Sequence, residues 1–570
     1  MNSLLLAALG VGALALGYRF YGRLITKWAG LDLEKPTPAH TLGDGVDYVP
    51  AKHWFVLFGH HFASIAGAMP IVGPVVACLF WGWLPAVLWI VFGAIFMGGV
   101  HDYLTLSTSV ENDGKTIGDL SESVLGRWAK IVFSIFVLLT LILVVGIFAD
   151  IAGKTLAGTP QVVVPTFGLI PVAMVVGLLV YRTALPLLVS TVIGLALLGG
   201  LLALGVAMPV SLPVASAATW WTVILLIYGM VAAVLPVSLL LQPRDHLGSG
   251  VLLFGMAAGF LGIVISHPQI KSPAYVAFSS GPGWLWPLMF VTVACGAISG
   301  FHCLVGSGTT SKQLPRAADA GRVGYGAMIL ESALALMAVI AVSAGLYWKD
   351  LPTGATEGFV FQQLMDKSTG GNPIKAFGAG YGELTKAMFG ATFGALIGIT
   401  MLKTFVMTTL DSATRISRYV ATELLGETFG VRAFRNRYVA TLFVGICGGA
   451  VALVGYQTIL LVFGSANQLI GALALIVVTG YLTTRGRRWL YAAVPAVLIL
   501  LTTAAALVYQ LVGFLRPPEG KDPHYGLAVI ALSLLVLALF VTCKGVATVA
   551  GVLRARGAAG QAQARVAPEA

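Results

Sequence analysis

Adjacent histidines, His60 and His61, lie within the apolar stretch FGHHFASIAGAMPIVGPVVA at residues 58–77. Histidine changes charge near neutral pH, so the pair could relay protons or bind a carboxylate group. The same stretch contains Ser64, Gly67 and two prolines, so a helix through it is expected to break. Neighbouring side chains on a regular helix point about 100° apart, and only a break would let both histidines face one ligand.

A second polar cluster lies in the stretch ACGAISGFHCLVGSGTTSKQL at residues 294–314. Its hydroxyls, together with carbonyls freed at a helix break, could coordinate Na⁺ or hold a polar substrate. Close packing of helices is the alternative explanation for its glycines. Packing does not explain its polar residues, and the candidate site residues here are Ser299, His302, Ser307, Thr309, Thr310 and Lys312.

Three acidic residues, Asp102, Glu331 and Asp411, are further candidates, because ionisable groups at membrane depth are costly and usually functional. Asp102 could carry a proton or a cation, or it could mark the membrane interface. Glu331 could pair with Lys403, whereas an unpaired Glu331 is expected to be protonated. Asp411 and Arg415 have the i,i+4 spacing of both a gate salt bridge and a helix-end ion pair.

A metal site is an alternative use of the same residue types. His60, His61, His101, Asp102 and His302 could converge if the apolar segments that carry them meet. The sequence has no local ligand spacing such as HExxH that would support this independently. Under this hypothesis the chain would be a metal-dependent membrane carrier or an intramembrane enzyme.

The composition places these residues in a membrane protein. The 570-residue chain is 58% hydrophobic and only 10% charged, whereas soluble domains carry about 25% charged residues. Its mean hydropathy is +0.91. The net charge of +11 comes from Lys and Arg in short loops, such as Arg244, Arg316 and Arg432. We interpret these residues as topology signals rather than as a nucleic-acid site.

Apolar runs of about 20 residues recur along the chain, and each is long enough to cross a bilayer. They predict an all-α polytopic membrane protein with about 15 transmembrane helices. The spans are expected at residues 2–18, 54–79, 83–108, 129–152, 161–181, 184–207, 219–241, 248–269, 284–310, 323–347, 384–410, 437–454, 457–481, 489–514 and 525–543. Most Lys and Arg then lie on the cytoplasmic side if the N-terminus is outside and the C-terminus is cytoplasmic.

Two blocks of five helices, at residues 54–207 and 219–410, are predicted to form an inverted repeat. An odd number of spans in the first block makes the second block enter the membrane from the opposite face. An extra N-terminal helix at 1–18 and additional C-terminal helices at 437–543 flank the repeats. A disordered cytoplasmic tail is expected at 555–570, from its composition.

Five segments of the sequence resemble signature segments of the carbon starvation protein A family. They are VLFGHHFASIAGAMPIVGPVVA, ACGAISGFHCLVGSGTTSKQL, VGYGAMILES, TLDSATRISRY and FGSANQLIGALAL, and the resemblance extends from Tyr48 to Leu473. It implies a bacterial inner-membrane protein that takes up small nutrients, with peptides and pyruvate as the usual substrates. It also implies a place among the amino-acid/polyamine/organocation transporters, with a five-plus-five inverted repeat like that of the leucine transporter.

The leading hypothesis is a transporter rather than an enzyme. The chain would import short peptides or pyruvate-like carboxylates by secondary active transport, driven by H⁺ or by Na⁺. No cofactor besides this coupling ion is expected, with the bound metal described above as the alternative. The expected partners are the small-molecule substrate and the lipid bilayer. His60, His61, Ser64 and the segment 299–313 would line the site, and helix N-terminal amides would face the substrate carboxylate.

Overall fold

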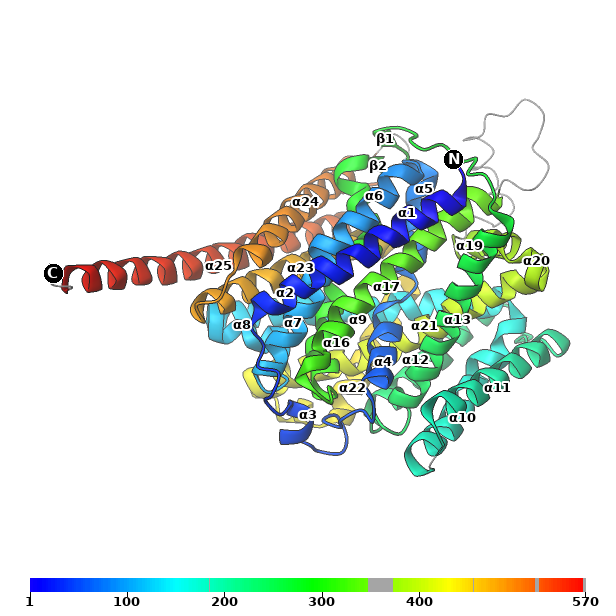
Figure 1. Cartoon of the computed structure of the whole chain (residues 1–570), viewed down its shortest axis with the longest axis horizontal. Coiled ribbons are helices and arrows are strands. Elements are labelled where there is room, and N and C mark those ends of the chain that lie inside the picture. Colours follow the sequence, from blue (N-terminus) through cyan, green and yellow to red (C-terminus); the bar gives the residue numbers. More distant parts are fainter. Residues whose placement is uncertain (184, 347–372, 455, 518–521, 567–570) are drawn as a thin grey trace.

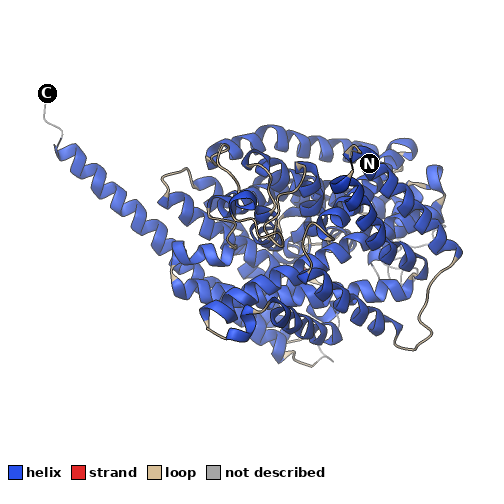
Figure 2. Cartoon of the chain, turned by 90° about the horizontal axis from the view of Figure 1, so that it is seen from below, coloured by secondary structure: helices blue, strands red, loops and turns tan. Residues whose placement is uncertain are grey.

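The computed structural model describes the chain except for residues 184, 347–372, 455, 518–521 and 567–570. Helices make up nearly all of the described secondary structure, as Figure 2 shows. A short hairpin pairs β1 (Ser279–Ser280) with β2 (Gly283–Trp284). Within the described ranges, 13 helices are long and apolar enough to cross a membrane, or up to 14 if one bent pair is a single span. The prediction of an all-α polytopic membrane protein is confirmed.

The helices follow one another along the chain as shown in Figure 1. They are α1 (Ser3–Leu16), continuing through Gly17–Gly22 into α2 (Arg23–Ala29), α3 (Pro38–Thr41), α4 (Trp54–Ile65), α5 (Met69–Phe80), α6 (Trp83–Gly93), continuing through Ala94–Gly98 into α7 (Gly99–Glu111), α8 (Ile117–Leu125), α9 (Arg127–Gly158), α10 (Val163–Arg182), α11 (Leu187–Ala207), α12 (Ala217–Val234), α13 (Leu241–Ser266), α14 (Phe290–Thr292), α15 (Ala294–Ala297), α16 (Gly300–Gly308), α17 (Ala320–Ile340), α19 (Pro373–Leu384), α20 (Lys386–Phe389), α21 (Ala391–Ala421), α22 (Arg437–Val454), α23 (Tyr456–Thr484), α24 (Leu490–Leu515) and α25 (Tyr525–Val566).

The predicted break in the stretch 58–77 is present between α4 and α5. The two helices meet at an angle of 44°, across Ala66, Gly67 and Ala68. Pro70 lies in the first turn of α5, where its fixed φ and missing N–H favour the start of a new helix. The freed backbone groups face protein rather than lipid, since all three linking residues are buried.

A second break divides the predicted span 284–310, so this stretch is not among the 13 or 14 helices counted above. The stretch 284–310 is apolar enough for a span, but Ile298 and Ser299 are extended (φ −162° and −128°) and separate α15 from α16. The resulting pieces are too short to be counted among the spanning helices. Hydropathy thus located the segment correctly, whereas the break depends on how its backbone is held by neighbouring helices.

The loops gather at two ends of the bundle. We call one of them the basic end; it is formed by residues 30–53, 112–126, 235–240, 309–319, 421–436 and 485–489. Hydrogen bonds join these loops, for example from Thr37 to the Leu314 carbonyl and from Thr116 to Glu423. At the opposite end, the Ile270 amide donates to the Met1 carbonyl.

The C-terminal helix differs from its prediction. Helix α25 continues to Val566 and extends away from the bundle in Figures 1 and 2, although a disordered tail is expected from residue 555. Alanine, arginine and glutamine are strong helix formers, so this composition permits either state. Residues 567–570 of the predicted tail lie outside the described residues.

Helices α9 and α21 pack against each other at the centre of the bundle, and α12 and α22 pack against both of them. Helix α4 packs against α13, and α16 packs against α7 and α23. The contact between α16 and α23 is very close: a Cβ atom at Gly300 would lie only 2.0 Å from the Asn467 carbonyl oxygen. Glycine at this position therefore lets the second break approach α23.

Candidate functional site

The first buried charge network joins four helices. We call it the Asp245 network; it consists of His60 on α4, Tyr228 on α12, Arg244 and Asp245 on α13, and Asp411 on α21. His60 Nδ1 lies 2.6 Å from Asp245 Oδ2, and Arg244 lies 3.0 Å from Asp245 Oδ1. Arg244 also donates to the Asp411 carboxylate, which accepts a 3.2 Å bond from the Tyr228 hydroxyl. The side chains of His60, Arg244, Asp245 and Asp411 are fully buried.

Formal charges show why this network can hold a proton. Two carboxylates face one guanidinium, so the network carries one excess negative charge when His60 is neutral. A proton on His60 cancels that charge. An excess charge buried inside a membrane protein is costly unless a partner compensates it.

The second buried charge network lies between α7, α16 and α17. We call it the Asp102 network; it consists of His101, Asp102, His302 and Glu331. Asp102 lies 2.7 Å from His101 Nδ1 and 2.8 Å from His302 Nδ1. The other ring nitrogen of His302 lies 3.2 Å from Glu331 Oε2. All four side chains are buried.

The Asp102 network can also exchange a proton. When His302 carries protons on both ring nitrogens, its single positive charge lies between two carboxylates. That state has one excess negative charge, which a proton on Glu331 removes. Asp102 has two histidine neighbours, whereas Glu331 has one. The negative charge of Glu331 is therefore compensated by fewer partners than that of Asp102.

His61 lies between the two networks. Its Nδ1 is 2.8 Å from the Thr310 hydroxyl, and its Nε2 has no hydrogen-bond partner in the described part of the chain. It interacts electrostatically with Asp102, His302 and His60. Both histidines precede the break, in the regular part of α4. In this structure the two histidines have different partners: His60 contacts Asp245 and Thr309, whereas His61 contacts Thr310.

The polar run after α16 reaches the same region. Thr309 places its hydroxyl 2.8 Å from His60 Nε2, and Gln313 donates to that hydroxyl over 2.7 Å. Gln242 of α13 donates to the Gln313 side chain. The predicted grouping of Thr309 and Thr310 with the two histidines is present, because 309–313 folds back as a short turn beside α4.

The break in α4–α5 packs on α21 and α9. The Ser64 and Ser412 hydroxyls are 2.9 Å apart, and the Thr409 hydroxyl donates to the Ser64 carbonyl over 3.0 Å. A Cβ atom at Gly67 would lie 3.0 Å from the Phe148 ring and 3.2 Å from the Thr409 hydroxyl. Ser64 and Gly67 thus bring the break into contact with both central helices.

Two candidates from the second stretch have other partners. Ser299 lies at the second break, where its hydroxyl accepts a 3.0 Å bond from the Asn467 amide of α23. Ser307 donates to the Cys303 carbonyl and accepts from the Ile117 amide. Ser307 therefore joins α16 to α8 and lies apart from the two charge networks.

The two ion pairs considered for Glu331 and Asp411 are replaced by others. Glu331 faces His302 rather than Lys403, whose ammonium donates to the Ala152 carbonyl of α9. Asp411 pairs with Arg244 rather than with Arg415. Residues four apart on a helix can interact locally, but tertiary partners on α13 and in the loop before α4 compete with that local pair.

A cluster of ion pairs lies at the basic end next to this region. The Asp47 clamp consists of Asp47, from the loop before α4, and Arg415 and Arg418 at the end of α21, at 2.7 Å and 3.0 Å. Burial alone would raise the pKa of the Asp47 carboxyl, but Arg418 and Arg415 outweigh it and hold that pKa below its usual value. Lys312 lies beside the clamp, with its ammonium 4.0 Å from the centre of the Tyr419 ring.

The metal hypothesis is not supported by this geometry. Its five residues are divided between the Asp245 network, the Asp102 network and the position of His61 between them. Across the described ranges, no group of three or more His, Cys, Asp or Glu residues is arranged to hold a metal ion.

Sequence reasoning missed Tyr228, Arg244 and Asp245 as members of the site. Arg244 was assigned to a loop as a topology signal, yet its side chain is fully buried. The available signal was the run QPRDH at 242–246, which places three ionisable residues between two apolar segments. Arg244 lies in α13 rather than in a loop. Its ion-pair partner, Asp411, is 167 positions away along the chain, so no local sequence pattern indicates the pair.

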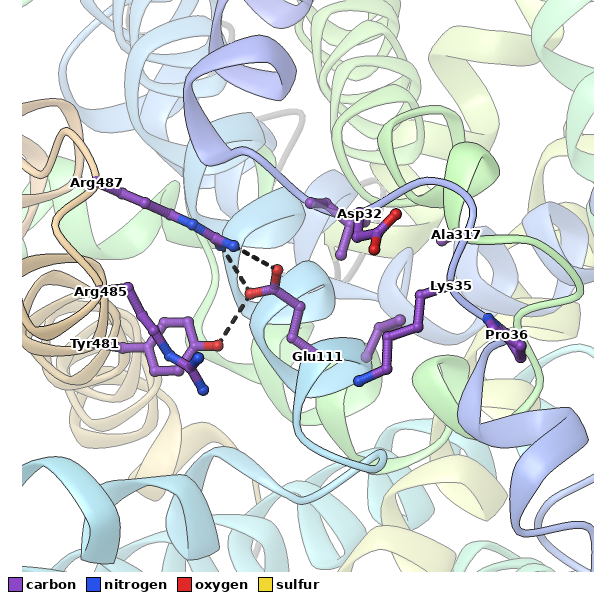
Figure 3. Close-up of a pocket in the computed structure, with 10 residues that line it drawn as sticks. Asp32, Lys35, Pro36, Glu111, Ala317, Tyr481, Arg485 and Arg487 are labelled. Atoms are coloured by element: carbon purple, nitrogen blue, oxygen red, sulfur yellow. Dashed lines mark hydrogen bonds and ion pairs between the residues drawn. The ribbon is translucent and has the colours of Figure 1, made fainter.

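A separate pocket of about 130 Å³ lies at the basic end, where α7 and α23 finish (Figure 3). Arg487 forms two 2.8 Å bonds with the Glu111 carboxylate, and the Tyr481 hydroxyl donates to it over 3.0 Å. Asp32 and Lys35 face the same pocket from the segment after α2. None of the predicted site residues lines it, and its ion pair fastens the ends of two helices together.

Known proteins resemble this chain over most of its length. "Peptide transporter CstA" of Mycobacterium tuberculosis is 34% identical, covering 90% of this chain and 76% of that protein. "Peptide transporter CstA" of Bacillus subtilis is 31% identical, covering 96% and 97%. "Pyruvate/proton symporter BtsT" of Escherichia coli is 32% identical, covering 90% and 82%.

Solved structures show a more distant likeness. A mutant of the Eremococcus coleocola manganese transporter aligns with a TM-score of 0.48 at 12% identity, covering 90% of this chain and 99% of that one. MhsT in complex with L-phenylalanine aligns with a TM-score of 0.44 at 14% identity, covering 87% and 98%. Both scores are too low to support an inference about this chain.

A sequence model described as "Carbon starvation protein CstA" matches residues 2–506, which include both breaks and both buried charge networks. This is a family of transporters, not of enzymes. The chain is a multi-pass membrane protein and a secondary transporter that belongs to the carbon starvation protein CstA family.

Proposed function

We propose that this transporter imports a small carboxylate or a short peptide together with protons across a bacterial inner membrane. The observation that carries the proposal is the Asp102 network, in which His302 lies between two buried carboxylates and Glu331 can take up a proton. The names of its relatives, peptide transporter and pyruvate/proton symporter, agree with this substrate class and this coupling ion.

The two breaks support a substrate position between α4–α5 and α15–α16. Broken helices at membrane depth present the N-termini of their second halves, whose amides favour an anionic group such as a carboxylate. Helix α5 begins at Met69, beside Ser64 and Gly67, and α16 begins at Gly300. His61 contacts Thr310 and interacts electrostatically with members of both networks.

Packing supports a particular inverted repeat. Three helix contacts each have a counterpart elsewhere in the bundle. The contact of α4 with α13 corresponds to that of α16 with α23, and the contact of α9 with α23 corresponds to that of α21 with α13. The contact of α4 with α17 likewise corresponds to that of α16 with α7. These pairs match if one repeat spans 54–266 and the other spans 285–484, with the α10–α11 hairpin inserted in the first. Each repeat then begins with a broken helix. We favour this division over the one predicted from the sequence, with repeats at 54–207 and 219–410.

The charges of the loops support an orientation with the basic end in the cytoplasm. The basic end holds exposed Lys and Arg residues such as Arg127, Arg316 and Arg432, and the positive-inside rule assigns such loops to the cytoplasm. The Asp47 clamp would then be a cytoplasmic gate. Both of its ion pairs are formed in this structure, since Asp47 contacts both arginines.

Uptake into proteoliposomes tests the proposal. Labelled pyruvate and a labelled dipeptide are supplied under an imposed pH gradient, under a Na⁺ gradient and with a protonophore, with protein-free liposomes as the control. We expect the pH gradient to drive accumulation of at least one substrate and the protonophore to abolish it. Accumulation that requires Na⁺ would overturn the assignment of the coupling ion, and uptake of neither compound would overturn the substrate class.

Asp47→Asn is expected to open the basic end. The substitution removes the negative charge that Arg415 and Arg418 share, so the clamp loses both ion pairs. In a cysteine-free background carrying Ser412→Cys, we expect alkylation from the basic end to become several-fold faster. Asp522→Asn, a change at an exposed carboxylate, is the matched control. Equal alkylation rates in the two variants would contradict a gating role.

The clamp should also respond to pH in a defined direction. Because the pKa of Asp47 is lowered, its ion pairs persist as the pH falls from neutral into the usual carboxyl range. They are lost only when the pH falls through the lowered pKa, where Asp47 takes up a proton. Alkylation of Ser412→Cys with Asp47 intact, measured relative to the same cysteine with Asp47→Asn at each pH, should therefore stay slow down to mildly acidic pH, and a ratio that rises to one above the usual carboxyl range would contradict this.

A further inference from the structure

A cavity of about 550 Å³ lies at the basic end between the N-terminal helix and the bundle. The segment α1–α2 forms one wall, and α17 with Tyr103 of α7 forms the other. Figure 1 shows α1 and α2 lying along α17. Four cations line this cavity, which we call the basic cleft: Arg19, Arg23, Lys27 and Arg322. No Asp or Glu is among its lining residues in the described part of the chain.

Three of these cations lie on one side of a single helix. Arg19, Arg23 and Lys27 are spaced four residues apart along the continuous helix from α1 through α2. Like charges at this spacing destabilise a helix. Within the described ranges none of the three forms an ion pair with a carboxylate, whereas Arg322 pairs with Asp319. Three of the four cations in the cleft therefore have no carboxylate partner in the described part of the chain.

The cleft borders the membrane. The helix that carries it is one of the candidate spans, Ser3–Ala29. Leu16 and Phe20, on other faces of that helix, are 60% and 68% exposed, as expected for side chains that contact acyl chains. An anion that fits these surroundings has a negatively charged headgroup at the level of Arg19 to Lys27 and apolar chains beside Leu16 and Phe20.

We propose that the basic cleft binds the phosphate headgroup of an anionic phospholipid. The lipid would supply the missing negative charge and connect the N-terminal helix to α17. Tyr18, which also lines the cleft, offers a hydroxyl donor to a phosphate oxygen, whereas the Thr26 hydroxyl donates to the Arg23 carbonyl. Basic residues at a membrane interface often extend toward water, and they need no cavity to do so. Here the basic residues face walls formed by α17 and Tyr103, which distinguishes this site from general surface attraction.

The test compares two double variants of the full-length protein. Arg23→Gln with Lys27→Gln removes two cations from the cleft. Arg127→Gln with Arg432→Gln removes two exposed cations of the same end that do not line it. Each protein is purified in detergent and titrated with phosphatidylglycerol, cardiolipin, phosphatidylethanolamine or inorganic phosphate. Bound lipid is counted by native mass spectrometry, and the thermal unfolding midpoint is recorded.

We expect the anionic lipids to bind the wild type and the control variant equally, and to raise their unfolding midpoints. The cleft variant should bind about tenfold or more weakly, because each basic group contributes substantially to attraction of an anionic headgroup. Equal losses in both variants would show general surface attraction and overturn the proposal. Equal stabilisation by inorganic phosphate alone would show a free-anion site and would overturn the lipid assignment.

Discussion

Replacing Glu331 by glutamine is expected to abolish proton-driven accumulation of substrate while leaving substrate exchange intact. Glutamine has nearly the shape of a protonated glutamic acid, so the variant mimics the Asp102 network with its second proton bound. The formal charges of the network then balance without a mobile proton, and His302 keeps Asp102 as its partner. Binding and reorientation of the substrate should continue, but they should no longer be linked to proton movement.

The measurement compares two kinds of flux in proteoliposomes. Uptake under a pH gradient should fall by about tenfold or more, as expected when a proton carrier is lost. Counterflow exchange of labelled against unlabelled substrate should stay within about twofold of wild type. Glu122→Gln makes the same chemical change at a carboxylate that is 45% exposed and pairs with Lys130, and it serves as the control. Accumulation by Glu331→Gln at the wild-type level would exclude Glu331 as the proton carrier.

Replacing Arg244 by glutamine is expected to destabilise the protein strongly. Arg244 is fully buried and contacts the carboxylates of Asp245 and Asp411. Without it, two buried carboxylates face only the charge that a protonated His60 can supply. Breaking a buried ion pair in this way costs about 3–5 kcal/mol of the free energy of unfolding, which can be measured by denaturant titration in mixed micelles.

A second substitution should restore much of this loss. Arg244→Gln with Asp411→Asn leaves Asp245 paired with His60 and removes one positive and one negative charge, so the formal charge of the Asp245 network returns to its wild-type value. Lys130→Gln, which removes a partly exposed cation from Asp119 and Glu122, is the control and should cost only about 0–1 kcal/mol. If the double variant were as unstable as Arg244→Gln alone, charge balance would not explain the role of Arg244.

The repeat proposal can be judged by how the two networks are distributed. The Asp245 network lies between α4 and α13 of one proposed repeat and α21 of the other. The Asp102 network likewise joins α7 of the first repeat to α16 and α17 of the second. Both networks thus cross the boundary between the repeats, which is where movement of one repeat against the other would change their contacts.

Much of this protein is determined locally by its sequence. Apolar runs of sufficient length specified the spans, because every backbone polar group in a bilayer must be satisfied within its own helix. Gly67 and Pro70 specified the first break, because proline has no backbone N–H to donate within a continuing helix. Polar residues within apolar runs, such as His60, Asp102 and His302, marked the site because membrane burial of ionisable groups is costly.

Tertiary structure alone decided which of these residues act together. Asp411 has Arg415 one turn away but pairs with Arg244 of another helix, and Glu331 faces His302 instead of Lys403. The second break and the orientations of His60 and His61 likewise depend on neighbouring helices. Hydropathy and spacing report the cost of burying a group, which is a local property of the chain. The choice of partner is set by which helices pack together, and that depends on contacts between residues far apart in sequence.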